Sequence, residues 1–385
     1  MSEENVGSVA SLISQVDLRL QSVHTQSLDI SFNELADMVR ENELDISPDY
    51  QRLFQWSEGA RSRFIESLLL EMPVPPIYMV EEEDNRKLLI DGLQRLSSYL
   101  HFRGMLVAPH LRPKPVLLGE KLTLQDCDIV TELNGRTYDD LGLSLQIKLK
   151  RSFVRVEVIK RGSNSKFKYH MFKRLNTGGE ALTNQQLRNC TIRLLDPKFN
   201  DFIIELAEGN TDFQDCTATI SDEQRYGAYD KELVLRFFAL KNSRAKFKHD
   251  VSDFLTDYME AVSDPDVQEP FDYASEKVVF ARTFHVLNQT LGAESFSRAD
   301  KTAKKLVKGF GVYHFEAFTL GLQAVLGRVD ADTEEGRIKM KDLLTGIKLD
   351  PAFIELTTGG GKNSPGPLTD RIRFVEDRLM ATYPE

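Results

Sequence analysis

Several features that mark specialised chains are scarce in this sequence. Only three cysteines, Cys127, Cys190 and Cys216, occur in 385 residues, and no two of them form a C-x-x-C pair. This spacing argues against a cysteine zinc site or redox pair, and the odd number favours reduced thiols. The seven histidines include no H-x-x-x-H pair, so the commonest local zinc pattern is also missing.

Long hydrophobic runs are absent too. No apolar stretch approaches the roughly 20 residues that cross a bilayer. The N-terminus, "MSEENVGSVASLISQ", is acidic and lacks the basic start and apolar middle of a secretory signal. With 41% hydrophobic and 28% charged residues, the composition is that of a soluble globular protein. We therefore expect a cytoplasmic protein without a membrane partner, large enough for two domains.

The chain also lacks a positive net charge. A formal charge of -10 repels phosphates and argues against a sequence-blind nucleic-acid binder. Residues 144–174 are the exception, because they carry ten Lys or Arg and one acid, with aromatic residues between them. Two interpretations stay open. The segment is either a solvated basic face or a surface that contacts nucleic-acid backbone through Arg155, Lys160, Arg161 and Lys166.

The first half of the chain alternates between strand and helix signals. "SLDIS" predicts a strand, and Ser31 with Glu34 predicts the capped start of a helix. A second helix is expected after Ser57 and must end before the prolines of "PVPP". "PPIYMV" and "KLLIDG" predict paired strands around a charged turn, and "SFVRVEVI" predicts a half-buried strand.

The second half has a helical texture. Thr183 and Gln186 predict a capping box. Phe280, Phe284 and Leu287 share one helical stripe, which indicates a buried face. We expect this half to be all-helical, with a loop at "TTGGGKNSPGP" and Glu232 paired with Arg236 on a helix surface.

The stretch "LLIDGLQRLSSYL" is the most informative motif, because polar groups stand where a strand passes into a helix. A helix start presents unpaired backbone N–H groups that stabilise an anion. Arg95 adds a planar cation suited to phosphate oxygens, and Asp91 could hold a divalent cation or orient the arginine. The simpler alternative is that Asp91 caps the helix, Gly92 permits the turn and Arg95 pairs with an acid.

Four sequence blocks carry a resemblance to a known family. "PDYQRLFQW", "SLLLEMPVPPIYMVE", "IDGLQRL" and "FKRLNTGGEALTNQQLRN" occur in this order over roughly residues 28–190. They resemble the N-terminal domain of GmrSD-type restriction proteins, whose hallmark is D-G-Q-Q-R. Asp91, Gly92, Gln94 and Arg95 match that hallmark, whereas Leu93 replaces its first glutamine.

The resemblance implies an α+β fold: a ParB/sulfiredoxin-like domain at 28–190, after an extension at 1–27, and before an all-helical domain at 191–385. It implies an NTP-binding subunit of a prokaryotic anti-phage or restriction-type system, with Mg²⁺ held at Asp91. Asp91, Gln94 and Arg95 are the implied catalytic residues, and whether NTP is hydrolysed stays open because of Leu93. The implied nucleotide-binding residues are Gln51, Arg52, Gly92, Asn176, Thr177, Gly178 and Arg188.

Two rival functions remain. The chain could be a non-catalytic DNA-binding or partner-binding subunit whose arginines contact phosphate backbone. It could also be a nuclease that uses Asp91 with Mg²⁺, which the lack of nearby paired acids disfavours. Relatives that cut DNA alone carry a histidine-metal centre, and His249, His285 and His314 stand far apart here. We therefore expect a separate nuclease or effector partner.

Overall fold

The computed structural model divides the chain into two compact units, residues 1–181 and 182–385. The structure describes residues 24–46, 56–82, 84–109, 111, 114–163, 167, 168, 171, 183–193, 195–248, 250–264, 266, 270–300 and 302–384.

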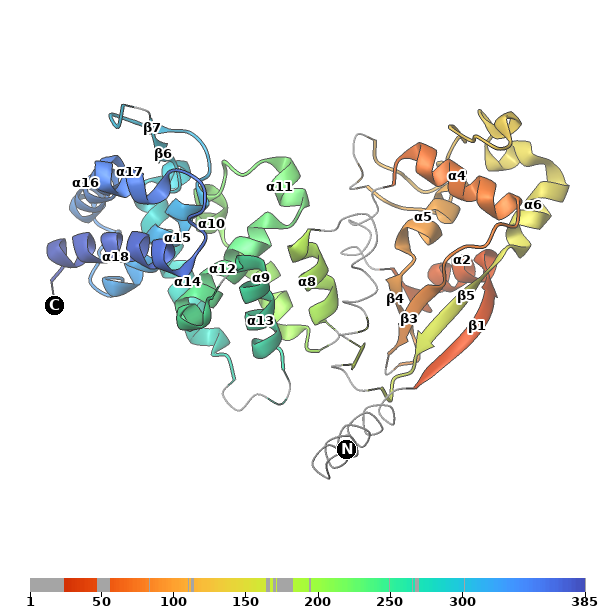
Figure 1. Ribbon diagram of the computed structural model, residues 1–385, viewed down its shortest axis with the longest axis horizontal. Coiled ribbons are helices and arrows are strands. Elements are labelled where there is room, and N and C mark those ends of the chain that lie inside the picture. Colours follow the sequence, from red (N-terminus) through yellow and green to blue (C-terminus); the bar gives the residue numbers. More distant parts are fainter. Residues whose placement is uncertain are drawn as a thin grey trace, which may run out of the picture. The chain divides into compact units, whose positions relative to one another are not determined.

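The first unit is built on a five-stranded mixed sheet in the order β1-β5-β3-β4-β2 (Figure 1). β3 and β4 form the expected antiparallel hairpin, and β5 joins it in parallel. β1 pairs antiparallel with β5, and β2 pairs parallel with β4. The strands are β1 (Thr25–Ser31), β2 (Leu44–Asp45), β3 (Ile77–Glu81), β4 (Lys87–Asp91) and β5 (Phe153–Ile159).

Within the described part of this unit, four α-helices and two short 3-10 helices, η1 and η2, accompany the sheet. Two of the predicted caps are present: Ser31 Oγ accepts the N–H of Glu34, and Ser57 Oγ accepts that of Ala60. These bonds satisfy backbone donors that a helix start otherwise leaves unpaired. The bounds are α2 (Phe32–Arg40), α4 (Glu58–Leu69), α5 (Leu93–Phe102), η1 (Thr131–Leu133), η2 (Tyr138–Leu141) and α6 (Gly142–Arg151).

The core of the first unit lies between one face of the sheet and its helices. Val154, Val156 and Val158 of β5 are buried in this core, as the alternating pattern predicts. The ring of Phe32 packs between those of Phe64 and Tyr99, at centroid distances of 5.7 and 5.4 Å. These contacts fasten α2, α4 and α5 together, and α4 and α5 carry the residues of the candidate site.

The second unit is helical, with one small exception. Its described helices are α8 (Asn184–Ile192), α9 (Lys198–Gly209), α10 (Thr211–Cys216), α11 (Asp222–Tyr226), α12 (Tyr229–Ser243), η4 (Arg244–Lys246), α13 (Val251–Val262), α14 (Tyr273–Thr290), η5 (Gly292–Glu294), α15 (Val312–Gly321), η6 (Leu322–Ala324), α16 (Glu334–Leu349), α17 (Pro351–Thr357) and α18 (Pro365–Thr382). The expectation of an all-helical half was wrong in one detail, because β6 (Arg298–Ala299) pairs antiparallel with β7 (Leu306–Val307).

A buried chain of alternating charges crosses the second unit. Arg188 meets Glu232 at 3.4 Å, Glu232 meets Arg236 at 3.0 Å, and Arg236 meets Glu316 at 2.6 Å. Glu316 also binds Arg371. The Glu232–Arg236 pair therefore exists, but the expectation of a surface pair was wrong, because Glu316 draws Arg236 into the interior.

The structure confirms the α+β class of the sequence prediction. A mixed sheet lies in the N-terminal unit, and helices dominate the C-terminal unit. The boundary between the contact-defined units falls at 181/182, whereas the sequence suggested 190/191. The difference is α8, which packs against α12 and α13 of the second unit.

Candidate functional site

The candidate site is the turn that joins β4 to α5. β4 ends at Asp91, α5 begins at Leu93, and Gly92 between them has φ +112°. A Cβ atom at Gly92 would lie 2.7 Å from Ile77 Cγ1, so the turn needs glycine for space as well as for its left-handed conformation. No side chain caps α5 at Gly92. The simpler prediction that Asp91 caps this helix was therefore wrong.

Arg95 is buried and turned toward the protein rather than toward solvent. Its Nη2 atom lies 2.7 Å from Asp91 Oδ2. Its Nη1 atom donates to the carbonyl of Pro75 and, at 3.1 Å, to that of Pro76. In this conformation Arg95 ties the turn to the segment that leads into β3. The Asp91 side chain is 36% exposed, so a ligand could reach its carboxylate.

Gln94 holds the end of the "PDYQRLFQW" block against α5. Its Oε1 atom accepts the backbone N–H of Trp56 at 3.1 Å. The carbonyl of Trp56 accepts a hydrogen bond from Arg61 Nε at 2.7 Å, and Arg61 Nη1 lies 3.2 Å from His101 Nδ1. The Trp56 ring packs edge-on against Phe64 at 5.9 Å, which is a core contact rather than an open stacking platform.

His101 accepts this hydrogen bond as a neutral ring. Burial, with the nearby Arg61 charge as a second cause, lowers the pKa of His101 to about 4. At neutral pH Nδ1 is therefore an acceptor for the guanidinium of Arg61. Gln94, Ser98 and His101 form a polar stripe at helical spacing on α5, and this spacing is the sequence signal that could have revealed the contact with Arg61.

Several predicted site residues lie outside the described residues. They are Gln51, Arg52, Lys166, Asn176, Thr177 and Gly178. The structure thus places Asp91, Gly92, Gln94 and Arg95 together at one turn and leaves the flanking blocks as predictions.

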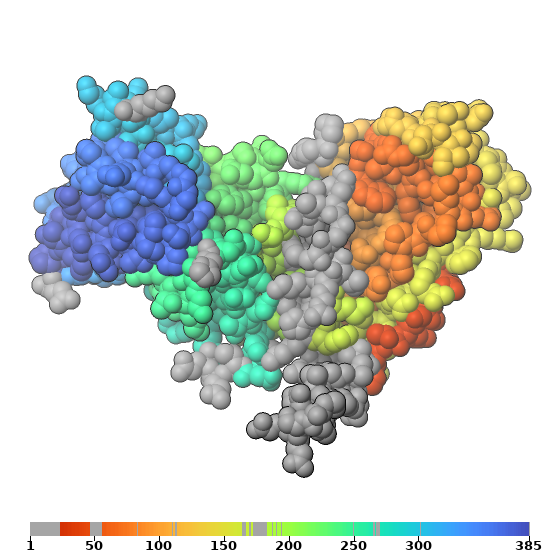
Figure 2. Space-filling view, in the orientation of Figure 1, coloured from red at the N-terminus to blue at the C-terminus, as the bar shows by residue number. Residues whose placement is uncertain are grey.

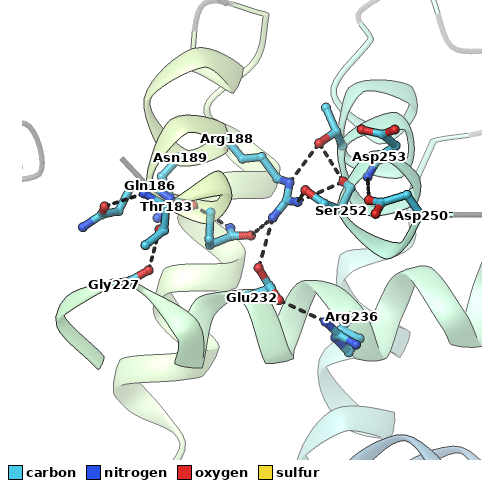
Figure 3. A network of polar contacts seen from close by, with 12 residues as sticks. Thr183, Gln186, Arg188, Asn189, Gly227, Glu232, Arg236, Asp250, Ser252 and Asp253 are labelled. Atoms are coloured by element: carbon cyan, nitrogen blue, oxygen red, sulfur yellow. Dashed lines mark hydrogen bonds and ion pairs between the residues drawn. The ribbon is translucent and has the colours of Figure 1, made fainter. Parts of the chain in front are cut away.

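Arg188 lies in the second unit, on α8. Its guanidinium donates to Thr256 Oγ1 at 3.0 Å, to Gln185 Oε1 at 2.8 Å and to the Ser252 carbonyl at 2.9 Å. Figure 3 shows it reaching from α8 toward Ser252 and Glu232. These contacts indicate that Arg188 stabilises the packing of α8, and a nucleotide contact remains a prediction.

The basic stretch is partly neutralised by neighbouring groups. Arg155 Nε lies 2.6 Å from Asp29, and this hydrogen bond lowers the pKa of the Asp29 carboxyl. Lys160 lies 3.1 Å from Glu81, and its hydrogen bond lowers the pKa of Glu81. Arg161 donates to Asn85 Oδ1 at 3.4 Å. The local positive field is therefore weaker than composition alone predicts.

Among the residues that the structure describes, no group of three or more His, Cys, Asp or Glu side chains could hold a metal ion. None of the helices in these ranges is long and apolar enough to cross a bilayer.

Residues 33–193 match the family model described as the N-terminal domain of the GmrSD restriction endonuclease. This segment is therefore similar to the N-terminal domains of GmrSD-type proteins. The match confirms the resemblance carried by the four sequence blocks and points to a protein of a restriction-type defence system. No match was found among curated proteins or among solved structures.

Proposed function

We propose that the GmrSD-type domain binds an NTP at the β4–α5 turn and that the chain is a nucleotide-responsive subunit of a restriction-type, anti-phage defence system. The observation that carries this proposal is the α5 start at Gly92, which has no side-chain cap, beside the part-exposed Asp91. The uncapped N–H groups of a helix start favour an anion, and phosphate is the anion that this geometry suits.

The residues of the turn divide into two roles. Asp91 would face the ligand, because one carboxylate together with nucleotide phosphates is a common way to hold Mg²⁺. When bound, Mg²⁺ would offset the charge of the phosphates. Gln94 and Arg95 would act as positioning residues, since their described bonds go to Trp56, Asp91 and the two prolines before β3.

The remaining contacts follow from the resemblance. As the resemblance implies, we propose that Gln51, Arg52, Asn176, Thr177 and Gly178 contact the nucleotide. Hydrolysis would require an oriented water, and Leu93 cannot provide the amide found in the family hallmark. The ParB/sulfiredoxin-like fold and a cytoplasmic location belong to the same proposal.

A nucleotide screen tests the proposal. Thermal unfolding of the full chain is followed with ATP, GTP, CTP or UTP and Mg²⁺. A ligand at about a hundred times its Kd stabilises the folded state by about 2.7 kcal/mol, so at least one nucleotide should raise the melting temperature by a few degrees. Asp91→Asn should remove most of this shift, whereas Asp84→Asn, at an exposed hairpin carboxylate, should retain it.

Two results would contradict this function. One is that no nucleotide shifts the wild type at millimolar concentration, and the other is that Asp91→Asn shifts as much as the wild type. The rival, a non-catalytic DNA-binding or partner-binding subunit, predicts DNA binding that ignores nucleotides and falls steeply with salt. The pairing of Arg155 and Lys160 with acids counts against that rival.

A further inference from the structure

Helix α6 presents large apolar side chains to solvent. Leu149 is its one buried residue among the ten. Leu143 is 72% exposed, Leu145 38% and Ile147 40%, and Phe153, two residues after the helix end, is 67% exposed. In Figure 2 the atoms of this helix, in yellow, form part of the surface of the first unit. Exposed apolar side chains gathered in this way mark an interaction surface more often than isolated ones do.

Basic side chains border these apolar residues. Leu143, Ile147 and Arg151 follow each other at i+4 spacing, and Lys150 is three residues from Ile147, so the four share one face of the helix. We call these four residues the α6 stripe. Among the described residues, neither Lys150 nor Arg151 has an acid partner. The stripe therefore combines apolar side chains with unneutralised positive charge.

The stripe is held by a rigid support. Gln146 Nε2 donates to the carbonyl of Tyr138 at 3.1 Å, and Ser152 Oγ donates to that of Leu68 at 3.2 Å. Lys148 meets Glu71 at 3.2 Å. These bonds and the buried Leu149 fix α6 on the unit, so a partner would meet a preformed surface with little ordering cost.

We propose that the α6 stripe is a docking surface for an amphipathic helix of a partner protein, whose apolar face covers Leu143 and Ile147 and whose Asp or Glu residues pair with Lys150 and Arg151. Charge complementarity selects an acidic partner. Lys150 and Arg151 share the face of Leu143 and Ile147, whereas a helix that lies in a bilayer interface carries its basic residues on the face opposite the apolar one. Phosphate backbone would satisfy the charges but would leave the apolar residues uncovered.

A synthetic probe tests this surface on the full chain. The probe is a fluorescent helical peptide with Leu on one face and Glu beside it, and its binding is measured by anisotropy. We expect saturable binding that Leu143→Ser with Ile147→Ser weakens by at least about tenfold, because two buried aliphatic contacts are lost. The matched control is Leu117→Ser with Leu118→Ser, since these two leucines are similarly exposed elsewhere in the unit, and it should bind normally.

Charge reversal separates the proposed partner from other occupants. The double variant Lys150→Glu with Arg151→Glu should bind the acidic peptide more weakly than the wild type does. It should instead bind a second peptide in which Lys replaces each Glu. Melting temperatures of all variants are compared with the wild type to exclude misfolding. The proposal is overturned if the peptide does not bind, if the stripe variants bind it normally, or if phosphatidylserine vesicles or duplex DNA bind through the same residues more tightly than the peptide does.

Discussion

Replacing Glu316 by glutamine should destabilise the second unit far more than its small chemical change suggests. Glu316 is buried and accepts hydrogen bonds from Arg236 at 2.6 Å and from Arg371 Nε at 3.1 Å. Glutamine keeps the volume but removes the charge, and its NH₂ group would face a guanidinium donor. Arg371 would then stay buried without the carboxylate that it binds, and Arg236 would lose one of its two carboxylate partners, Glu316 and Glu232.

The expected magnitude follows from the cost of unpaired buried charge. Breaking a buried pair by removing one partner costs about 3–5 kcal/mol, in contrast to about 0–1 kcal/mol for an exposed pair. For a unit of ~200 residues this corresponds to a fall of roughly 6–20 °C in melting temperature. Because glutamine leaves no cavity, we expect a value near the lower end of this range.

The assay is urea and thermal unfolding of the full chain, followed by circular dichroism. The control is Glu355→Gln, because this side chain is exposed and makes no ion pair with a described residue; it should change stability by less than about 0.5 kcal/mol. The triple substitution Arg236→Met, Glu316→Leu and Arg371→Met should recover most of the lost stability, because it removes all three charges together and Glu232 keeps Arg188 as its partner. If Glu316→Gln is no worse than the control, the explanation by buried charge is refuted.

Two further predictions concern the turn and the effect of pH. In urea unfolding, Gly92→Ala should destabilise the first unit more than Gly119→Ala does. Both glycines have positive φ, but of the two Gly92 alone lacks room for a Cβ. Equal losses of unfolding free energy would show that crowding by Ile77 is irrelevant. The hydrogen bond to Asp332, with Asp212 as a further partner, raises the pKa of His285 in the folded state. The contribution of His285 to stability is therefore full below about pH 6.5 and is lost as pH rises through the folded pKa. The difference in unfolding free energy between wild type and His285→Gln should shrink over that rise. A difference that stays constant with pH would contradict this assignment.

Structure that depends on neighbouring residues could be predicted from the sequence. The caps at Ser31, Ser57 and Thr183 are present, because each joins a side chain to a backbone N–H three residues away. The β3–β4 hairpin and the alternation of β5 were predicted for the same reason. Thus local spacing was sufficient for these elements.

Contacts between distant residues could not be predicted in this way. The burial of Arg236 depends on Glu316, 80 positions away, and the direction of Arg95 depends on the carbonyls of Pro75 and Pro76. At the candidate site, the hallmark residues were found by resemblance and their turn by the strand-to-helix pattern. The bonds that join Gln94 and Arg61 to Trp56 were missed, because no periodic pattern connects a side chain to a distant backbone.

The place of α8 bears on how such proteins can be rearranged in evolution. The family match ends at residue 193, yet α8 packs within the unit that starts at 182. A recombination breakpoint just after 193 would separate Arg188 from Ser252, Thr256 and Glu232, three of the partners that hold its guanidinium in the second unit. The segment 33–193 can therefore be joined to a different C-terminal domain only if that domain supplies equivalent acceptors for Arg188, or if the breakpoint falls before α8.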